Sequence, residues 1–176
     1  MNMTRKGWFV PVLAAAAMCW GSTLAAQDND EPEGNQTTLA KAVMGARVPL
    51  ERGLAASASH GQAISAKFEI EEGKLQLSVY TLKDGKYFEV IVDHNSGKVV
   101  KAESITEAED YTAAQSQSAA MAKAKGSLRA AVEQALRGNA GFRAVSVMPS
   151  LKDGRPVADV TLARGEELKT VSLPMP

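Results

Sequence analysis

Cysteine and histidine are nearly absent from this chain of 176 residues. The single cysteine, Cys19, lies in an apolar stretch near the amino terminus. Without a second cysteine the chain forms no internal disulfide and has no thiol pair for redox chemistry or structural zinc binding. The two histidines are His60 and His94. Asp93 and His94 could supply two metal ligands, but no third lies nearby, so we expect ordinary turn residues there.

Net charge and aromatic residues are also lacking. The 20 basic residues equal the 20 acidic ones, which gives no electrostatic case for a nucleic acid or an anionic membrane as partner. Aromatic residues make up only 5% of the chain, so each folded unit must have a small core. The length allows one domain of ordinary size or two small ones.

Catalytic motifs are missing as well. The sequence has no G-x-S-x-G, H-E-x-x-H or C-x-x-C motif and no nucleotide-binding glycine pattern. The adjacent carboxylates Glu71-Glu72 and Glu166-Glu167 would lie in solvated turns or on opposite faces of a strand, which is typical of surface charge. We therefore expect no catalytic residue, no cofactor and no metal. An enzyme whose motif is not recognisable is the less favoured alternative.

What is present begins with the pattern of a secretory signal. Arg5 and Lys6 precede an apolar run over residues 8–20, and small residues follow over residues 23–26. A charged segment, a short apolar segment and a small-residue cleavage site occur in this order in signal peptides. We interpret residues 1–26 as a cleaved signal peptide of a bacterial protein that is then periplasmic or secreted.

A membrane anchor is the alternative interpretation of the same segment. The apolar run is shorter than the roughly 20 residues that span a bilayer, so we expect no span in the mature chain. Met18 stands before Cys19, where a lipoprotein signal requires a small residue, and this disfavours lipidation. We expect cleavage between Gly21 and Gln27.

Residues 27–36 form an acidic segment with almost no apolar residue, which predicts a disordered linker. A helix capped by Thr37 or Thr38 is expected to continue through Ala46. Pro49 predicts a break near Val48 and a second helix from Pro49 to about Ser57.

Alternation of apolar and polar residues then predicts strands. Residues 63–71, 74–83 and 86–93 each alternate with period two and are separated by turns at Gly73 and Gly85. A third turn at Gly97 leads to a short fourth segment at Lys98–Lys101. The predicted core lies under the second helix and contains Leu50, Leu54, Phe68, Leu77, Val79, Phe88 and Val90.

The motif DGKYFEVIVD, closed by D-x-x-S-G-K-V-V, resembles the PepSY domain. The resemblance covers Leu50–Val100 and, more weakly, Met121–Leu173. It implies an α+β fold and a role in binding proteins or peptides. PepSY modules occur in propeptides of thermolysin-type proteases, where they inhibit the protease or assist its folding. They also occur in free-standing envelope proteins and beside sensors and membrane reductases.

The second half of the chain repeats the first. Ala40-Lys41-Ala42 matches Ala122-Lys123-Ala124 at an offset of 82 residues, and Glu72-Gly73-Lys74 matches Asp153-Gly154-Arg155 at 81. An unbroken helix is predicted from Met121 to Arg137, because Ala131 stands where the first half has Pro49. Strands are predicted over residues 142–147, 157–162 and 168–173, and Pro149 favours an edge position for the first of them or a bend.

The sequence therefore predicts an α+β protein of two small modules. Each is an amphipathic helix on a three-stranded antiparallel sheet, with a fourth strand as an option in the first. The first module covers residues 37–105, and the second, degenerate one covers residues 121–176. Residues 106–120 are a linker or the lead-in to a helix.

The expected function is that of an exported, non-catalytic PepSY-repeat protein that binds an envelope or secreted protein and modulates or inhibits a protease. The predicted contact surface is the polar outer face of the first sheet, namely Lys67, Glu69, Gln76, Ser78 and Glu89. The alternative is an accessory sensory module for a membrane sensor or reductase. Such a module would hold a small molecule or a metal between helix and sheet, in a pocket with convergent polar groups.

Overall fold

The computed structural model describes residues 33–176, and within them the chain is α+β, as predicted. The predicted signal peptide and most of the predicted linker lie outside the described residues. The first half contains α1 (Glu33–Gly45), α2 (Leu50–Ala56), the short 3-10 helix η1 (Ser57–His60), β1 (Gln62–Glu71), β2 (Lys74–Lys83), β3 (Lys86–Val92) and β4 (Val99–Ser104). The second contains α3 (Ala108–Lys123), α4 (Leu128–Arg137), β5 (Arg143–Lys152), β6 (Arg155–Arg164) and β7 (Glu167–Pro174).

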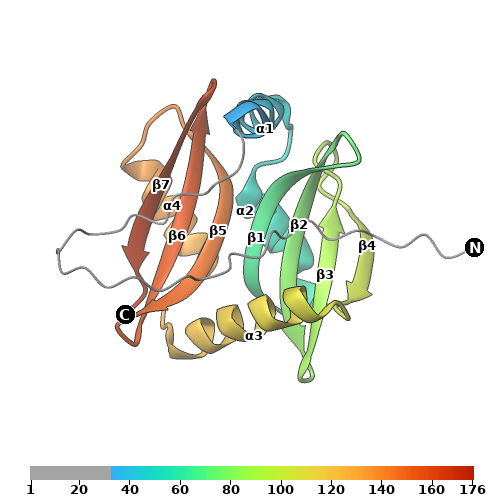
Figure 1. The fold of residues 1–176 in the computed structure, drawn as a ribbon, viewed down its shortest axis with the longest axis vertical. Helices are drawn as coiled ribbons and strands as arrows, with labels where there is room; N and C mark the ends of the chain where they lie inside the picture. Colours follow the sequence, from blue (N-terminus) through green and yellow to red (C-terminus); the bar gives the residue numbers. More distant parts are fainter. Residues whose placement is uncertain (1–32) are drawn as a thin grey trace, which may run out of the picture. The chain divides into compact units, whose positions relative to one another are not determined.

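All seven strands form one antiparallel sheet in the order β4-β3-β2-β1-β5-β6-β7 (Figure 1). The expectation of a separate small sheet for each module is therefore wrong. The first strands of the two halves, β1 and β5, pair with each other through Ala66 with Val147 and Lys67 with Ser146. A first strand left unpaired would expose a row of backbone donors and acceptors, and this pairing satisfies some of them.

The junction between the halves has the geometry of an internal twofold axis. Ala66 pairs with Val147, its counterpart 81 positions later. The register shift between Ala63 and Ser65 in β1 recurs between Ala144 and Ser146 in β5, again 81 positions later. Equivalent residues that pair antiparallel are related by a rotation of half a turn. The repeat seen in the sequence is thus matched by a repeat of strand geometry.

Three hairpin turns have the residues and dihedral angles of type I′ turns. They are Glu72-Gly73 (φ 51° and 75°), Asp84-Gly85 (52° and 73°) and Asp153-Gly154 (51° and 74°). Type I′ turns need positive φ at both central residues, and their twist matches that of the flanking strands. These turns confirm the predicted positions of the three hairpins.

The break between the two helices of the first half follows the prediction. The predicted start of the first helix is wrong, because α1 begins at Glu33, within the predicted disordered linker and before the predicted caps Thr37 and Thr38. In the second half the predicted helix is itself divided. Pro49 is the N-cap of α2, and no helix continues from Gly45 to Leu50. The unbroken helix predicted for Met121–Arg137 is wrong, because α3 ends at Lys123 and α4 begins at Leu128.

Capping explains the second break. The Ser127 side chain accepts a hydrogen bond from the Ala130 backbone N–H at 3.1 Å and so starts a new helix. Gly126, just before it, favours the end of the preceding helix. The segment between the modules is mostly helical, since α3 begins at Ala108.

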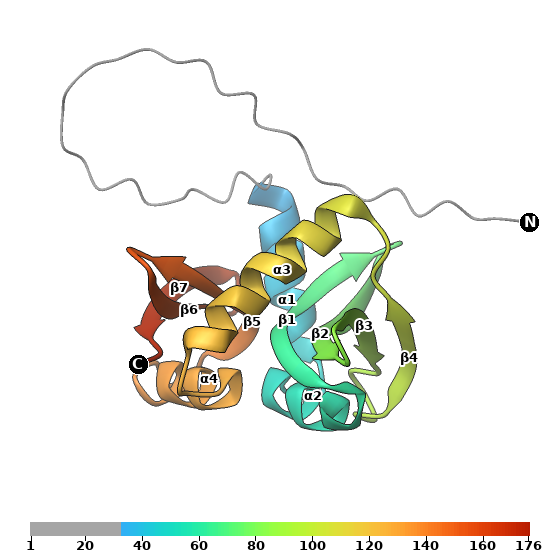
Figure 2. The ribbon, with the colours of Figure 1, turned by 90° about the horizontal axis from the view of Figure 1, so that it is seen from below.

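The short helices α2 and α4 lie side by side on one face of the sheet (Figure 2). The core includes buried residues of these helices and of the sheet, and α1 and α3 add Ala40, Val43, Ala114 and Met121. The first half buries the predicted Leu50, Leu54, Phe68, Leu77, Val79 and Val90. Phe88 shares their face but is only half-buried, because β3 reaches the margin of the core there. The second half continues the same core with Val132, Ala135, Val147, Val160 and Leu162.

Pro149 lies in an interior strand, so the edge position, one of the two predicted alternatives, is wrong. β5 has β6 on one side and β1 on the other. Pairing with β1 involves only Ser146 and Val147, whereas pairing with β6 extends to Lys152. Pro149 therefore lies beyond the β1 pairing, in a part of the strand where a missing N–H costs less.

Candidate functional site

The five residues predicted to bind a partner lie together on one face of β1, β2 and β3. Lys67 lies opposite Ser78, and Glu69 lies opposite Gln76. Glu89 on β3 lies opposite Tyr80, which shares its side of β2 with Ser78. This face is turned away from the core residues Phe68 and Val79, because successive side chains of a strand point to opposite sides. We call it the polar face: Lys67, Glu69, Gln76, Ser78 and Glu89.

Side-chain interactions order the polar face. The Ser78 hydroxyl donates to Glu69 Oε1 at 2.8 Å, and Gln76 Nε2 donates to the Ser78 hydroxyl at 2.9 Å. Lys67 Nζ lies 2.7 Å from Glu69 Oε2, and these two side chains are only 25% and 23% exposed. Partly buried, connected networks hold their side chains in one arrangement. The face is therefore preorganised rather than a set of independent surface charges.

Helix α3 crosses one end of this face. The Ser65 hydroxyl of β1 donates to Gln117 Oε1 of α3 at 2.7 Å. The rings of Tyr87 on β3 and Tyr111 on α3 meet edge to face, with centroids 5.2 Å apart. Sequence analysis missed this contact, because the segment reads as polar. The available signal was the helical spacing of Tyr111, Ala114 and Met121.

Beside the polar face, β4 forms an open edge of the sheet. Among residues 33–176, β3 is its only neighbour in the sheet, and residues 100–104 are exposed, with Val100 at 64%. The Ile105 N–H donates to the Tyr87 carbonyl at 2.9 Å, so Ile105 faces β3. Successive residues of an antiparallel strand direct their backbone N–H and C=O groups to opposite sides. Since Ile105 directs its N–H toward β3, Ala102 and Ser104 direct theirs outward, away from the sheet. These groups can accept another strand.

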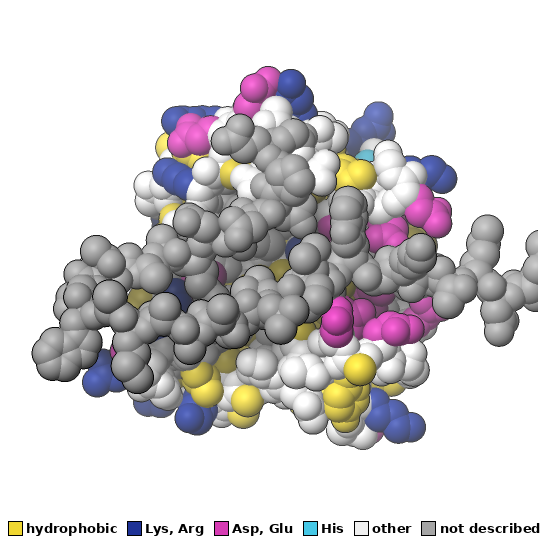
Figure 3. Space-filling view, viewed as in Figure 1, with side chains coloured by type: hydrophobic (Ala, Val, Ile, Leu, Met, Phe, Trp, Pro, Cys, Tyr) yellow, Lys and Arg dark blue, Asp and Glu magenta, His cyan; other side chains and the backbone are white. Residues whose placement is uncertain are grey.

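Acidic residues gather where β3, β4 and the start of α3 meet (Figure 3). Glu89 and Glu103 lie directly opposite each other on β3 and β4. Lys101 Nζ lies 2.6 Å from Glu103 Oε2. Glu109 and Asp110 follow in the first turn of α3. Like charges at opposite positions of a sheet repel, so a cationic partner would be favoured there.

The turn that holds the two candidate metal ligands has a structural contact. The backbone N–H groups of Arg47 and Val48 donate to the His94 carbonyl at 3.1 and 2.9 Å, which joins this turn to the connection between α1 and α2. Asp93 Oδ1 accepts the Ser96 N–H at 2.7 Å, and hydrogen bonds from Ser96 lower the pKa of Asp93. Within residues 33–176, no group of three or more His, Cys, Asp or Glu side chains could hold a metal ion.

No protein-family model matches the chain, and no curated protein matches it. Among solved structures, it is similar to a Clostridium difficile 630 protein described as a "putative lipoprotein". The sequence identity is 12%, the TM-score is 0.42, and the match covers 74% of this chain and 88% of that chain. A likeness of this size carries no argument about function. None of the helices in the described part of the chain is long and apolar enough to cross a membrane.

Proposed function

We propose that this is an exported, non-catalytic protein of two PepSY-like repeats that binds an extended segment of a partner protein along β4. The observation that carries the proposal is the exposed edge of β4, with the backbone groups of Ala102 and Ser104 turned outward. A bound segment would add an eighth strand to the sheet, with main-chain hydrogen bonds supplying affinity. The neighbouring polar face would supply specificity through Lys67, Glu69, Gln76 and Glu89. Ser78, the fifth predicted contact residue, is fully buried and holds Glu69 in place instead.

The charge of this region favours a basic segment in the partner. Glu89 and Glu103 lie beside the edge, and Glu109 and Asp110 follow at the start of α3. Lysine or arginine side chains of an added strand would relieve the repulsion between these carboxylates. The resemblance to propeptide modules makes an envelope protease the first partner to test, as a target of inhibition or modulation.

Export is part of the proposal and has its own test. Residues 1–26 carry the order of segments found in secretory signals. Amino-terminal sequencing of the protein recovered from periplasm or medium should show a chain that begins between Gly21 and Gln27. A mature protein that retains Met1 would contradict export by a cleaved signal.

Substitutions at Ala102 test the edge. Ala102→Pro removes the outward N–H and leaves the N–H groups that face β3 in place. Ala102→Ser keeps the outward N–H and is the matched control. We expect the wild type and Ala102→Ser to retain the same specific protein from an envelope extract, and Ala102→Pro to lose it.

Binding of the captured protein should also protect the backbone amides of β4 from hydrogen exchange. On its binding, amide hydrogen exchange should slow in residues 100–104 and not along β7, the other edge of the sheet. The double variant Lys67→Glu with Glu89→Lys should weaken binding through the polar face. If Ala102→Pro binds as well as the wild type, the edge is not the contact.

A further inference from the structure

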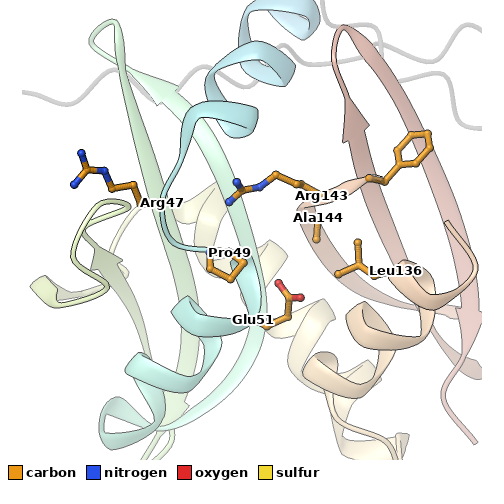
Figure 4. Close-up of a pocket in the computed structure, with 7 residues that line it drawn as sticks. Arg47, Pro49, Glu51, Leu136, Arg143 and Ala144 are labelled. Carbon is orange, nitrogen blue, oxygen red and sulfur yellow. The ribbon is translucent and has the colours of Figure 1, made fainter. Parts of the chain in front are cut away.

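A second candidate site lies on the core side of the sheet, between the two halves (Figure 4). It is an open pocket of about 340 Å³. The first half supplies Arg47, Pro49 and Glu51 from the α1–α2 connection and the first turn of α2. The second half lines the opposite wall with residues that include Leu136, Arg143 and Ala144, from the end of α4 and the start of β5. The volume is near the lower end of the range of small-molecule sites, about 300–1,000 Å³.

Two opposite charges face this pocket from its two walls. Arg143 reaches from β5 toward the α1–α2 connection, and the Glu51 carboxylate rises from α2 below it (Figure 4). Glu51 Oε2 is buried and has no hydrogen-bond partner among the described residues. Arg143 Nη2 makes one long contact, 3.5 Å, to the Val48 carbonyl. Within residues 33–176 no ion pair joins Glu51 to an arginine of the pocket.

A buried carboxylate oxygen without a partner is costly, because it has lost water and gained nothing in return. A guanidinium has five N–H donors, and Arg143 uses one of them on the Val48 carbonyl. The pocket therefore offers an acceptor on one wall and several donors on the other. Apolar carbon from Pro49, Leu136 and Ala144 lies between them.

In the second half, the equivalent arginine and glutamate form an ion pair with each other. Arg129 and Glu133 are the counterparts of Arg47 and Glu51, 82 positions later. They form an ion pair of 2.9 Å, four residues apart on the surface of α4. Arg47 cannot make this pair, because the break at Pro49 leaves it outside α2. Its side chain points away from Glu51 (Figure 4). The break thus leaves Glu51 available to the pocket.

We propose that this pocket binds a free α-amino acid with an apolar side chain. The ammonium group would donate to Glu51, and the carboxylate would accept from Arg143. The side chain would lie against Pro49, Leu136 and Ala144. A zwitterion satisfies both charges at once, whereas a simple anion or cation satisfies one and leaves the other desolvated. The proposal is independent of partner binding at β4, because no residue of β4 lines the pocket.

Binding is tested first on the unaltered protein by isothermal titration calorimetry. The probes are L-leucine, L-methionine and L-phenylalanine. We expect at least one to bind with a Kd of about 1 mM or lower. The analogues of that amino acid that lack the carboxylate or the ammonium should bind at least about tenfold more weakly, because each loses a charged hydrogen-bond partner. The proposal is overturned if none of the three binds, or if either analogue binds as well as the amino acid.

Variants then locate the site. Glu51→Gln and Arg143→Gln should each weaken binding about tenfold or more. The matched control is Glu133→Gln, the same change at the counterpart position, which should leave the Kd unchanged. Thermal unfolding of each variant verifies that it is folded, and if Glu51→Gln does not fold, the analogue series on the wild type decides. Equal weakening by Glu133→Gln, or unaltered binding by folded Glu51→Gln, would place any bound amino acid elsewhere.

Discussion

Gly53 shows how closely α2 approaches the sheet. A Cβ atom at this position would lie 2.6 Å from Leu77 Cδ2, and Leu77 is fully buried and cannot move aside freely. The counterpart in the second half is Ala135, which is buried in α4. The first half thus needs glycine where the second half accommodates a methyl group. The first half needs glycine because the large side chain of Leu77 lies directly beneath α2 at this position.

Gly53→Ala tests this contact. In the wild type we expect a net loss of stability, since overpacking costs about 1–3 kcal/mol and alanine returns about 1 kcal/mol of helix propensity. In a Leu77→Ala background the clash is gone, and Gly53→Ala should stabilise by about 1 kcal/mol. Urea unfolding of the four proteins measures the cycle. Gly45→Ala is the control, because a Cβ atom at Gly45 would have no neighbour within 4 Å. Equal effects of Gly53→Ala in both backgrounds would contradict the contact.

Asp93 gives a residue-scale prediction for pH. Hydrogen bonds from the Ser96 side chain and backbone lower the pKa of Asp93 below its ordinary value of 3.8. A carboxyl with a lowered native pKa contributes stability above its unfolded pKa and loses it as pH falls through the native pKa. The stability difference between the wild type and Asp93→Asn should therefore be present at pH 6 and shrink below about pH 4. An NMR titration that finds Asp93 at or above the ordinary pKa would refute this assignment.

At the scale of elements, the separation of α3 from α4 depends on one capping side chain. Ser127 accepts the Ala130 N–H and starts α4, which carries the buried Leu128 and Val132. The two helices of the second half thus repeat the two helices of the first, although no proline separates them. A serine cap after a glycine has the same effect as Pro49, by satisfying a helix terminus rather than by removing a donor.

Ser127→Ala should lower the free energy of unfolding by about 1 kcal/mol, the usual cost of losing an N-cap. Ser116→Ala is the matched control, since Ser116 is exposed within α3 and alanine is the better helix former there. Chemical denaturation followed by circular dichroism measures both variants. A neutral result for Ser127→Ala together with an unchanged start of α4 would show that the cap does not define this helix.

At the scale of the described molecule, residues 33–176, the two halves share one core. β1 pairs with β5, α1 contacts β6 and β7 of the second half, and α3 contacts β1 of the first. Lys41 Nζ on α1 lies 2.7 Å from Glu166 Oε1, but both side chains are more than half exposed. Such a surface ion pair contributes little to the free energy of folding. The two halves are therefore held together by the burial of apolar side chains between them.

We therefore expect a single cooperative unfolding transition. Urea titrations followed by NMR signals from Val79 in the first half and Val160 in the second should give the same midpoint. Residues 33–105 expressed alone should lack a cooperative transition, because the surface of β1 and α1 that faces the second half would be exposed. Two separate midpoints, or a stably folded isolated half, would mean that the modules are independent.

The local sequence determined the strands, the hairpin turns and the first helix break. Alternation, the Asp84-Gly85 and Asp153-Gly154 turns and Pro49 act over a few residues, so they could be read without a structure. The clustering of Lys67, Glu69 and Ser78 on one face followed from the same period of two. The burial of Leu77 and Val79 followed from it as well.

Only the tertiary structure decided how these pieces join. The pairing of β1 with β5 joins residues about 80 positions apart, and no local pattern specifies it. Helix α3 has few large apolar residues, so its sequence alone does not show where it packs. In the structure Gln117 reaches Ser65, Tyr111 meets Tyr87, and Ala114, Ala120 and Met121 are buried. The pocket at Glu51 and Arg143 exists because both halves contribute a wall. Contacts of this kind are selected by the summed burial of the whole sheet, to which each segment contributes only a part.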